Sequence, residues 1–245
     1  MKITIITATY NSETTIIDTL KSINSQTYSD IEHIIVDGAS TDNTLALVKK
    51  YGERVSQVIS EKDKGTYDAL NKGISLATGE VIGLLHADDC FAYNEALADI
   101  ADIFKTHGTD AIYGDLAYIP RFGKRRLVRT WISGEYTDKK FYQGWMPPHP
   151  TFYMKRSCYQ SLGGYDISLK IAADYDAMVR YMLIKKIKVV YIPKILVYMK
   201  MGGISTRLSD KYASFKEEMI VIQRYQLGGF ITFIKKKLYK LPQFF

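Results

Sequence analysis

The chain has 245 residues, of which 47% are hydrophobic, so it suffices for one large domain or two small ones with a buried core. No apolar run reaches the roughly 18 residues of a membrane span, the apolar start is too short for a signal peptide, and Cys90 and Cys158 form no CxxC zinc motif. The net charge of +7 is uneven, because residues 1–100 carry 8 basic and 15 acidic residues while residues 101–245 carry 25 basic and 11 acidic residues, so we expect different partners for the two halves.

The first 90 residues alternate between β-branched runs and segments with helical periodicity. The runs at 2–8, 32–36, 55–60 and 81–85 predict strands. The segments between them, which include 12–26 and 67–77, predict helices, with Ser12 or Thr14 as candidate cap of the first. This alternation predicts an α/β fold with a mainly parallel sheet and right-handed crossovers.

Acidic residues follow three of these predicted strands. Asp37 ends the second, Asp63 lies in the loop after the third, and Asp88 with Asp89 closely follows the buried fourth. In open α/β sheets, ligands bind at the carboxyl ends of the strands. Two adjacent carboxylates repel each other, and Mg²⁺ is typically held by one or two carboxylates plus substrate phosphates. The pattern indicates a metal–diphosphate site; the alternative is a plain turn, in which Asp is common.

Two nucleotide-binding fingerprints are missing from the sequence. No GxGxxG follows the first predicted strand, which argues against a dinucleotide dehydrogenase, and no GxxxxGK[ST] is present, which argues against a P-loop NTPase.

The second half predicts more irregular structure. A helix is expected at 95–107, a short strand at 111–113, a hairpin at 118–131 around Gly123, a strand at 151–154 and a helix at 155–162. The proline-rich segment 144–150 cannot be helical. A helix from 171 to about 185 has Asp174 and Asp176 in its first turn, where negative charge suits the helix dipole. Two strands, separated by Pro193, are expected at 189–192 and 195–199. A flexible loop at 202–206 and C-terminal helices follow, and the whole chain is expected to form one domain.

Four motifs occur together in an order that resembles one known family. They are Thr7-Ala-Thr-Tyr-Asn11, Asp37-Gly-Ala-Ser-Thr-Asp42, Asp63-Lys-Gly-Thr-Tyr-Asp68 with Asn71 and Gly73, and Ala87-Asp-Asp89. Together they resemble the inverting GT-A glycosyltransferases of family 2, in particular the bacterial enzymes that build O-antigen, capsule and exopolysaccharide repeat units. The resemblance covers about residues 2–205 and implies a GT-A fold, with a single Rossmann-like nucleotide-binding domain and additional C-terminal helices.

The resemblance also implies roles for individual residues. Residues expected to bind the nucleotide-sugar, a UDP-sugar in the family's usual case, are Thr7, Ala8, Tyr10, Asp37, Asp63, Lys64 and Asp88. Asp89 is expected to bind a divalent metal, Mn²⁺ or Mg²⁺, and Asp174 matches the catalytic base. The alternative for Asp37 is a turn residue that precedes a helix, and for Asp174 a carboxylate at a helix N-terminus.

The sequence departs from the family pattern in two places. Ala173 replaces the Glu of the usual Glu-Asp pair, which leaves open whether Asp174 or Asp176 is the base, and His86 receives no role. The QxxRW sequence of processive synthases is absent, which favours addition of one sugar per encounter. The resemblance implies an inverting hexosyl or N-acetylhexosaminyl transferase of enzyme class EC 2.4. Trp145 and His149 could contact an acceptor sugar, or could equally pack around the prolines.

Two other kinds of protein remain as alternatives. A sugar-nucleotide pyrophosphorylase would need a glycine-rich, basic loop after the first strand, where this chain has Thr9-Tyr-Asn-Ser12. A catalytically inactive sugar- or nucleotide-binding module would have no reason to keep Asp37, Asp88, Asp89 and Asp174 together.

The C-terminal segment combines apolar and basic residues. We expect residues 1–227 to form the GT-A domain, with a nucleotide-sugar half at 1–115 and an acceptor half at 116–205, and residues 228–245 to form a basic amphipathic helix. Such a helix suits an anionic membrane surface better than nucleic acid. We therefore expect a cytoplasmic protein, peripheral on the inner face of the plasma membrane, with a glycan or lipid-linked glycan as acceptor; the alternative is a helix packed on the domain with solvated lysines.

Overall fold

A computed structural model of the chain describes residues 1–121, 126–201 and 208–239. Its strands are β1 (Ile3–Thr9), β2 (Ile31–Asp37), β3 (Val55–Ser60), β4 (Val81–Leu84), β5 (Asp89–Phe91), β6 (Ala111–Ile119), β7 (Arg129–Trp131), β8 (Tyr153–Lys155) and β9 (Val189–Lys200). Its helices are α1 (Ile16–Asn24), α2 (Thr44–Tyr51), α3 (Thr66–Leu76), α4 (Ala96–His107), α5 (Asp138–Tyr142), α6 (Arg156–Leu162), α7 (Ala173–Met178), α8 (Leu208–Arg224) and α9 (Phe230–Leu238), with a 3-10 turn η1 (His149–Thr151) and a π-helical turn η2 (Val179–Ile184).

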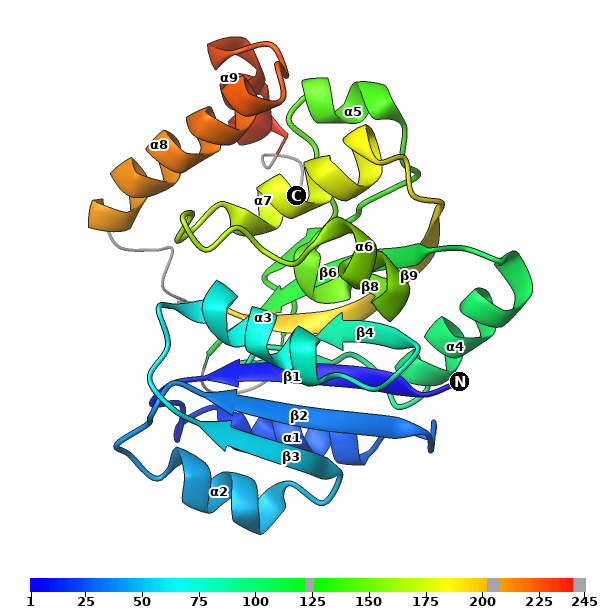
Figure 1. Ribbon diagram of the computed structural model, residues 1–245, viewed down its shortest axis with the longest axis vertical. Helices are drawn as coiled ribbons and strands as arrows, with labels where there is room; N and C mark the ends of the chain where they lie inside the picture. Colours follow the sequence, from blue (N-terminus) through cyan, green and yellow to red (C-terminus); the bar gives the residue numbers. More distant parts are fainter. Residues whose placement is uncertain (122–125, 202–207, 240–245) are drawn as a thin grey trace.

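The strands in the described part of the chain form one sheet, in the order β3-β2-β1-β4-β8-β6-β9-β5, with β7 paired to β6. The first four strands are parallel, and their carboxyl ends point to the same edge (Figure 1). Beyond β4 the pairing is mixed, because β8 is antiparallel to both β4 and β6 while β6 and β9 are parallel. The predicted α/β class and the parallel arrangement of the first four strands are confirmed.

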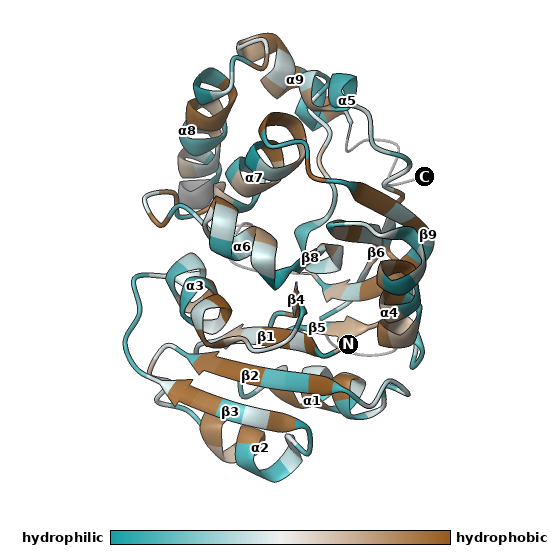
Figure 2. Cartoon of the chain, turned by 45° about the vertical axis from the view of Figure 1, so that its right-hand side comes forward, coloured by the Kyte–Doolittle hydropathy of each residue, from teal (hydrophilic) through white to brown (hydrophobic). Residues whose placement is uncertain are grey.

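Helices cover both faces of the parallel strands, with α3 on one side and α1 and α2 on the other (Figure 2). In β2, Ile34 and Val36 join the core that contains α3, whereas Ile35 packs with Ile16, Leu20 and Val48 of α1 and α2. This period of two follows from strand geometry, and burial on both faces explains why β2 is apolar along most of its length.

Two strands differ from their sequence prediction. β9 is continuous through Pro193, where a break was expected, because the register with β6 shifts between Tyr113 and Asp115 and the bulge accommodates the proline. β5 was not predicted as a strand; it pairs antiparallel with β9, so Asp89 lies opposite Met199. The predicted hairpin tip at Gly123 and the loop at 202–206 lie outside the described residues.

Helix α9 packs on the domain beside α5 (Figures 1 and 2), with the Thr232 hydroxyl donating to the Tyr142 carbonyl oxygen at 3.2 Å. Lys236 is buried, with its Nζ 3.5 Å from a carboxylate oxygen of Glu218 and 3.5 Å from the centroid of the Tyr175 ring. The expectation that all the lysines of this helix face solvent or lipid is therefore wrong for Lys236. Among the helices within the described ranges, none is both long and apolar enough to cross a bilayer.

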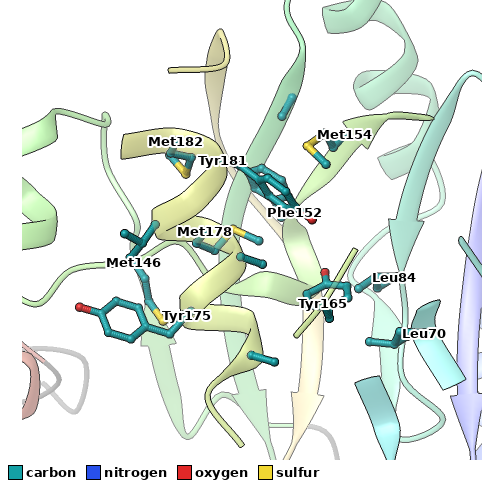
Figure 3. Close-up of a cluster of buried hydrophobic side chains, with 14 of the residues drawn as sticks. Leu70, Leu84, Met146, Phe152, Met154, Tyr165, Tyr175, Met178, Tyr181 and Met182 are labelled. Atoms are coloured by element: carbon teal, nitrogen blue, oxygen red, sulfur yellow. The ribbon is translucent and has the colours of Figure 1, made fainter. Parts of the chain in front are cut away.

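The core beneath α7 is rich in methionine and tyrosine. Figure 3 shows Met146 beside Tyr175 and Met178 at one end of this cluster, and Leu70 and Leu84 at the other. One apolar core thus continues from the parallel strands to the helix that carries Asp174. The predicted division at residue 115 falls inside β6, so the two proposed halves share one sheet.

Candidate functional site

The loops after β1 and β2 are held together by hydrogen bonds. Asn11 donates its backbone N–H to the Ser40 hydroxyl at 2.8 Å, and its side-chain oxygen accepts the Thr41 N–H at 2.9 Å. Asn11 has a positive φ of 47°, which Asn tolerates better than most residues. The two motifs therefore form one edge of the site.

Asp37 is completely buried at the end of β2. Its carboxylate accepts the backbone N–H of Ser40 at 2.9 Å and the hydroxyl of Ser60 at 2.7 Å, and it also accepts the Ser40 hydroxyl. These donors fix the carboxylate at the carboxyl end of the strand. Asp37 therefore stabilises the turn after β2 through Ser40 and also connects this turn to Ser60 at the end of β3.

Gly38 allows Asp63 to approach this edge. A β-carbon at Gly38 would lie 2.7 Å from an Asp63 carboxylate oxygen and 3.4 Å from the Tyr10 ring. Asp63 also accepts the Gly65 N–H at 2.8 Å, and the Tyr10 side chain is 62% exposed. Tyr10 and Asp63 therefore both approach Gly38, the residue that follows Asp37. These three predicted nucleotide-binding residues come from separate loops.

Three other residues predicted to bind the nucleotide-sugar are Thr7, Ala8 and Lys64, and they differ in how accessible they are to a ligand. Thr7 is completely buried, and its hydroxyl lies 3.0 Å from Nε2 of His33, so it supports the sheet in this state. Ala8 is half-buried beside the core. Lys64 is exposed, while its backbone carbonyl accepts from the Lys170 ammonium at 2.7 Å.

Asp88 and Asp89 follow β4 in the chain. Asp89 begins β5, the strand that pairs with β9. Asp89 is completely buried, and neither of its carboxylate oxygens has a hydrogen-bond partner at ordinary distance. Burial and the charge of Asp88 raise its pKa well above the usual range. Burial also raises the pKa of Asp88, against the opposing charges of Arg121 and Lys200.

A divalent cation fits this pair of acids. A buried, ionised carboxylate that has no hydrogen-bond partner and lies beside a second carboxylate destabilises the folded protein unless a positive charge compensates it. Lys200 supplies part of that charge, but its ammonium is 2.5 Å from Asp18. No cluster of three or more His, Cys, Asp or Glu side chains suited to a metal occurs in the described ranges. A site for Mg²⁺ with one or two carboxylates would need oxygens of a bound phosphate to complete it.

Asp174, in the first turn of α7, is held from two sides. One carboxylate oxygen accepts the Tyr175 N–H at 2.7 Å, and the other lies 3.3 Å from Nδ1 of His149. Burial acts to raise the Asp174 pKa, but the hydrogen bond from His149 and the charge of Lys236 outweigh it, so the pKa is lowered. About a fifth of the side chain, 19%, remains accessible.

Asp176 occupies a different environment from Asp174. Its buried carboxylate accepts from the guanidinium of Arg224 at 2.5 Å and from the Tyr225 hydroxyl at 3.0 Å, and lies 3.6 Å from Arg180. These contacts join α7 to η2 and α8. The side chain that remains available for chemistry is therefore Asp174.

Asp89 and Asp174 both influence the pKa of Tyr118. Burial raises the pKa of this tyrosine on β6, Arg129 opposes that effect, and the charges of Asp89 and Asp174 add to it. The charge of each carboxylate therefore reaches the same tyrosine, although Asp89 lies on β5 and Asp174 on α7.

The structure corrects the expectation for Trp145 and changes that for His149. Trp145 is completely buried against Tyr113, Tyr136 and Phe141, and its indole N–H donates to the Ser133 carbonyl at 2.9 Å. Trp145 cannot contact an acceptor in this structure, because its whole side chain is buried by packing around the proline-rich loop. His149 faces Asp174 instead of open solvent.

Two residues of the site were missed by sequence reasoning. His86 has its Nε2 2.8 Å from Nε2 of His149, and burial lowers its pKa to about 3. Its position directly before Ala87-Asp-Asp89 was the available signal. Lys200 lies at the end of β9, and no local pattern marked it.

Solved structures with the same fold include two glycosyltransferases with bound nucleotide-sugars. S. aureus TarS 1–349 in complex with UDP-GlcNAc superposes with a TM-score of 0.73 at 20% identity, over 99% of this chain and 71% of that one. The mannosyltransferase PcManGT from Pyrobaculum calidifontis, in complex with GDP-Man and Mn²⁺, gives a TM-score of 0.69 at 18% identity, over 99% and 72%. The chain spans 42% of the longer TarS structure. At these identities the likeness establishes the fold.

Sequence relatives establish the family. A PGL/p-HBAD biosynthesis glycosyltransferase of Mycobacterium bovis (strain BCG / Pasteur 1173P2) is 31% identical over 198 residues, which cover 78% of this chain and 74% of that protein. An uncharacterized glycosyltransferase of Mycobacterium tuberculosis, Rv1514c, is 31% identical over 188 residues, or 74% and 69%. Residues 4–171 match the family described as Glycosyl transferase family 2. The chain therefore belongs to glycosyl transferase family 2 and is a glycosyltransferase.

Proposed function

We propose that the protein transfers one sugar from a nucleotide-sugar to a glycan acceptor, with inversion at the anomeric carbon. The observation that carries this proposal is the contrast between Asp89 and Asp174. The pKa of Asp89 is raised by burial and by Asp88, whereas that of Asp174 is lowered by His149 and Lys236 despite burial. Their surroundings also differ, because the buried Asp89 oxygens have no hydrogen-bond partner, whereas Asp174 accepts the Tyr175 N–H and faces Nδ1 of His149. Two carboxylates in such different environments suit two different roles.

The donor proposed is a UDP-sugar. Asp37 is the residue proposed to accept the N3–H of uracil, because a carboxylate is a suitable acceptor. In the structure this carboxylate is buried and accepts from Ser40 and Ser60, so base binding would have to displace or share one of these donors. The exposed Tyr10 ring beside Gly38 can cover a base or ribose. The TarS complex with UDP-GlcNAc supports this choice, while the GDP-Man complex of PcManGT supplies the competing one.

We assign Asp89, with Asp88 beside it, as the holder of a Mn²⁺ or Mg²⁺ ion together with the donor diphosphate. When bound, such an ion stabilises the charge that develops on the leaving phosphate. In this proposal the two residues orient the diphosphate at the end of β4, and Asp88 faces the ribose or the sugar.

Asp174 is proposed as the general base. An acceptor hydroxyl oxygen attacks the anomeric carbon while the bond from that carbon to the diphosphate oxygen breaks, and the hydroxyl proton passes to Asp174. A lowered pKa keeps this carboxylate ionised at neutral pH, so it is ready to accept the proton. A single attack opposite the leaving group converts an α-linked donor into a β-linked product.

The acceptor proposed is a lipid-linked glycan of bacterial surface polysaccharide synthesis, which would place the enzyme on the cytoplasmic side of the plasma membrane. In this scheme residues 1–115 bind the donor and residues 116–205 the acceptor. Exposed apolar residues on α9 favour contact with lipid; they are Phe230, Ile231, Ile234 and Leu238, and the exposed Lys235 and Lys237 lie among them.

The test is a thermal-shift and hydrolysis screen of the purified protein against UDP-, GDP- and dTDP-sugars, with and without Mn²⁺. We expect a UDP-sugar to stabilise the protein and Mn²⁺ to strengthen the effect. Asp89→Asn should abolish the Mn²⁺-dependent part and turnover. Asp138→Asn is the matched control, because Asp138 is an exposed carboxylate paired with Lys186. Near-normal Mn²⁺-dependent activity of Asp89→Asn would contradict the metal assignment.

A further inference from the structure

His149 and Asp174 are joined by a contact between a rigid turn and the first turn of a helix. Nδ1 of His149 lies 3.3 Å from one carboxylate oxygen of Asp174, and the other oxygen accepts the Tyr175 N–H at 2.7 Å. Each oxygen therefore has a donor, and the carboxylate plane is fixed. Only 17% of the His149 side chain is exposed.

The backbone around His149 is held in place. Pro148 and Pro150 flank it, and the Thr151 hydroxyl lies 2.8 Å from the Pro148 carbonyl and 3.0 Å from the Gly114 carbonyl. Proline restricts its own φ and the conformation of the preceding residue. The imidazole consequently has a fixed direction toward Asp174.

Asp174 and His86 together determine which nitrogen of His149 carries the proton. The two Nε2 atoms lie 2.8 Å apart, so one donates and the other accepts. An ionised carboxylate only accepts, so the His149 nitrogen facing Asp174, Nδ1, must carry a proton. In a neutral His149 the Nε2 is then the acceptor, and His86 donates to it. This assignment follows from the hydrogen-bond pattern.

We infer that His149 is a positioning residue for Asp174, anchored by His86, and that it does not bind the acceptor sugar. This inference rests on the proposed role of Asp174 as base. Both nitrogens of His149 are engaged, so a hydrogen bond to an acceptor would break one of these contacts. The proline-rich loop therefore orients the base.

A spectroscopic test needs no substrate. The chain has four histidines, so ¹⁵N signals of labelled protein can be assigned with single His variants. We expect His149 to be protonated at Nδ1 and bare at Nε2. Asp174→Asn should change the His149 signals, because an amide can donate as well as accept, while His33 and the exposed His107 stay unchanged. A wild-type His149 protonated only at Nε2, or His149 signals insensitive to Asp174→Asn, would overturn the inference.

A kinetic test separates positioning from acceptor binding. His149→Ala should lower kcat by about 10²-fold with little change in acceptor KM, which is the cost of misplacing a catalytic group by about 1 Å. Removing the hydrogen bond that lowers the Asp174 pKa should move the acidic limb of the pH–rate profile to higher pH. The other titratable groups coupled to Asp174 are His86, Lys236, Tyr67 and Tyr118, and all of them remain in the variant.

Two further variants complete the design. His149→Asn should restore part of kcat, because its amide nitrogen is attached to Cγ as Nδ1 is and can donate to Asp174. His149→Ala added to Asp174→Asn should cause no further loss, because the effect passes through Asp174. A raised acceptor KM with unchanged kcat and pH profile would instead assign His149 to the acceptor. Full activity of Asp174→Asn alone would remove the proposed base, whereas the NMR result would still decide the contact.

Discussion

Lys236 lies against Gly144 so closely that a β-carbon on Gly144 would come within 2.4 Å of the Lys236 backbone nitrogen. Gly144 also has a φ of +81°, which other residues rarely adopt. The glycine thus allows α9 to pack against the segment that leads to His149.

We expect Gly144→Ala to destabilise the protein by about 1–3 kcal/mol, the usual cost of overpacking, and to increase hydrogen exchange in α9. The midpoint of urea unfolding and exchange measured by mass spectrometry provide the readouts. Gly108→Ala is the control for backbone strain alone, because Gly108 has a φ of +52° and nothing within 4 Å of a β-carbon. Equal destabilisation in both variants, without increased exchange in α9, would contradict the contact.

Asp174→Asn and Asp176→Asn should fail in different ways. Asp174→Asn should lower kcat by about 10²–10⁴-fold, as for a lost acid–base group, with donor affinity and stability nearly unchanged. Asp176→Asn should instead lower the free energy of unfolding by about 2 kcal/mol or more, because it breaks a buried ion pair with Arg224. Steady-state kinetics and urea unfolding of both variants decide this, and the reverse pattern would exchange the two roles.

The product should have an inverted anomeric centre. With an α-linked donor from the screen, proton NMR of the purified product should give the large anomeric coupling of a β-glycoside for gluco- and galacto-configured sugars. The sugar released by donor hydrolysis, observed before it mutarotates, is the control. An α-linked product would require a different catalytic geometry from the one proposed for Asp174.

Acid should destabilise the protein through a buried histidine. Burial lowers the pKa of His33 from 6.5 to about 3, so below pH 6.5 the unfolded chain binds a proton that the folded protein does not. The stability linked to His33 is therefore complete above pH 6.5 and falls by about 1.4 kcal/mol per pH unit as the pH decreases toward 3. Urea unfolding between pH 7 and pH 4.5 should show a shallower decline for His33→Gln, and an unchanged slope would show that His33 does not contribute.

The exposed face of α9 should bind anionic vesicles. We expect Ile231→Ser/Leu238→Ser to reduce co-sedimentation with phosphatidylserine-containing vesicles, because both side chains are more than half exposed, at 64% and 55%. Binding of the unmodified protein should decrease as salt rises, since each lysine near such a surface contributes about 1 kcal/mol. Val58→Ser, at an exposed apolar residue on β3, is the control. Equal sedimentation of all variants would contradict docking through α9.

The first half of the fold could be predicted because its signals are local. The alternation of β-branched runs with helical periodicity located β1 to β4 and α1 to α3 within a few residues. A parallel sheet then brings its strand ends to one edge, so the positions of Asp37, Asp63 and Asp89 followed from topology. β5 could not be predicted, because a strand of three residues is too short to show a periodicity and forms through its pairing with β9.

The surroundings of the site residues in the second half could not be predicted, because they depend on contacts between segments that are far apart in the sequence. The sequence left Asp174 and Asp176 equivalent, and only the position of Arg224 on α8 distinguishes them. In the same way, a tryptophan on a proline-rich loop is compatible with either a sugar or a core, and the aromatic residues around Trp145 decide for the core. His86 and His149 meet because β4 and η1 are neighbours in space, which no spacing rule reveals.

The pairing of β5 with β9 has a consequence for synthesis on the ribosome. Lys200, at the end of β9, pairs with Asp18 although the two are 182 positions apart, and β9 also holds the strand that begins with Asp89. A nascent chain that has exposed the four motifs at residues 7–11, 37–42, 63–68 and 87–89 still lacks the strand that pairs with Asp89, the proposed metal-binding acid. Contacts of such long sequence separation form late, so the proposed donor site should be completed only after about four-fifths of the chain has emerged. On this proposal, a growing polypeptide would not capture nucleotide-sugar before Asp174, the proposed base, has also been made.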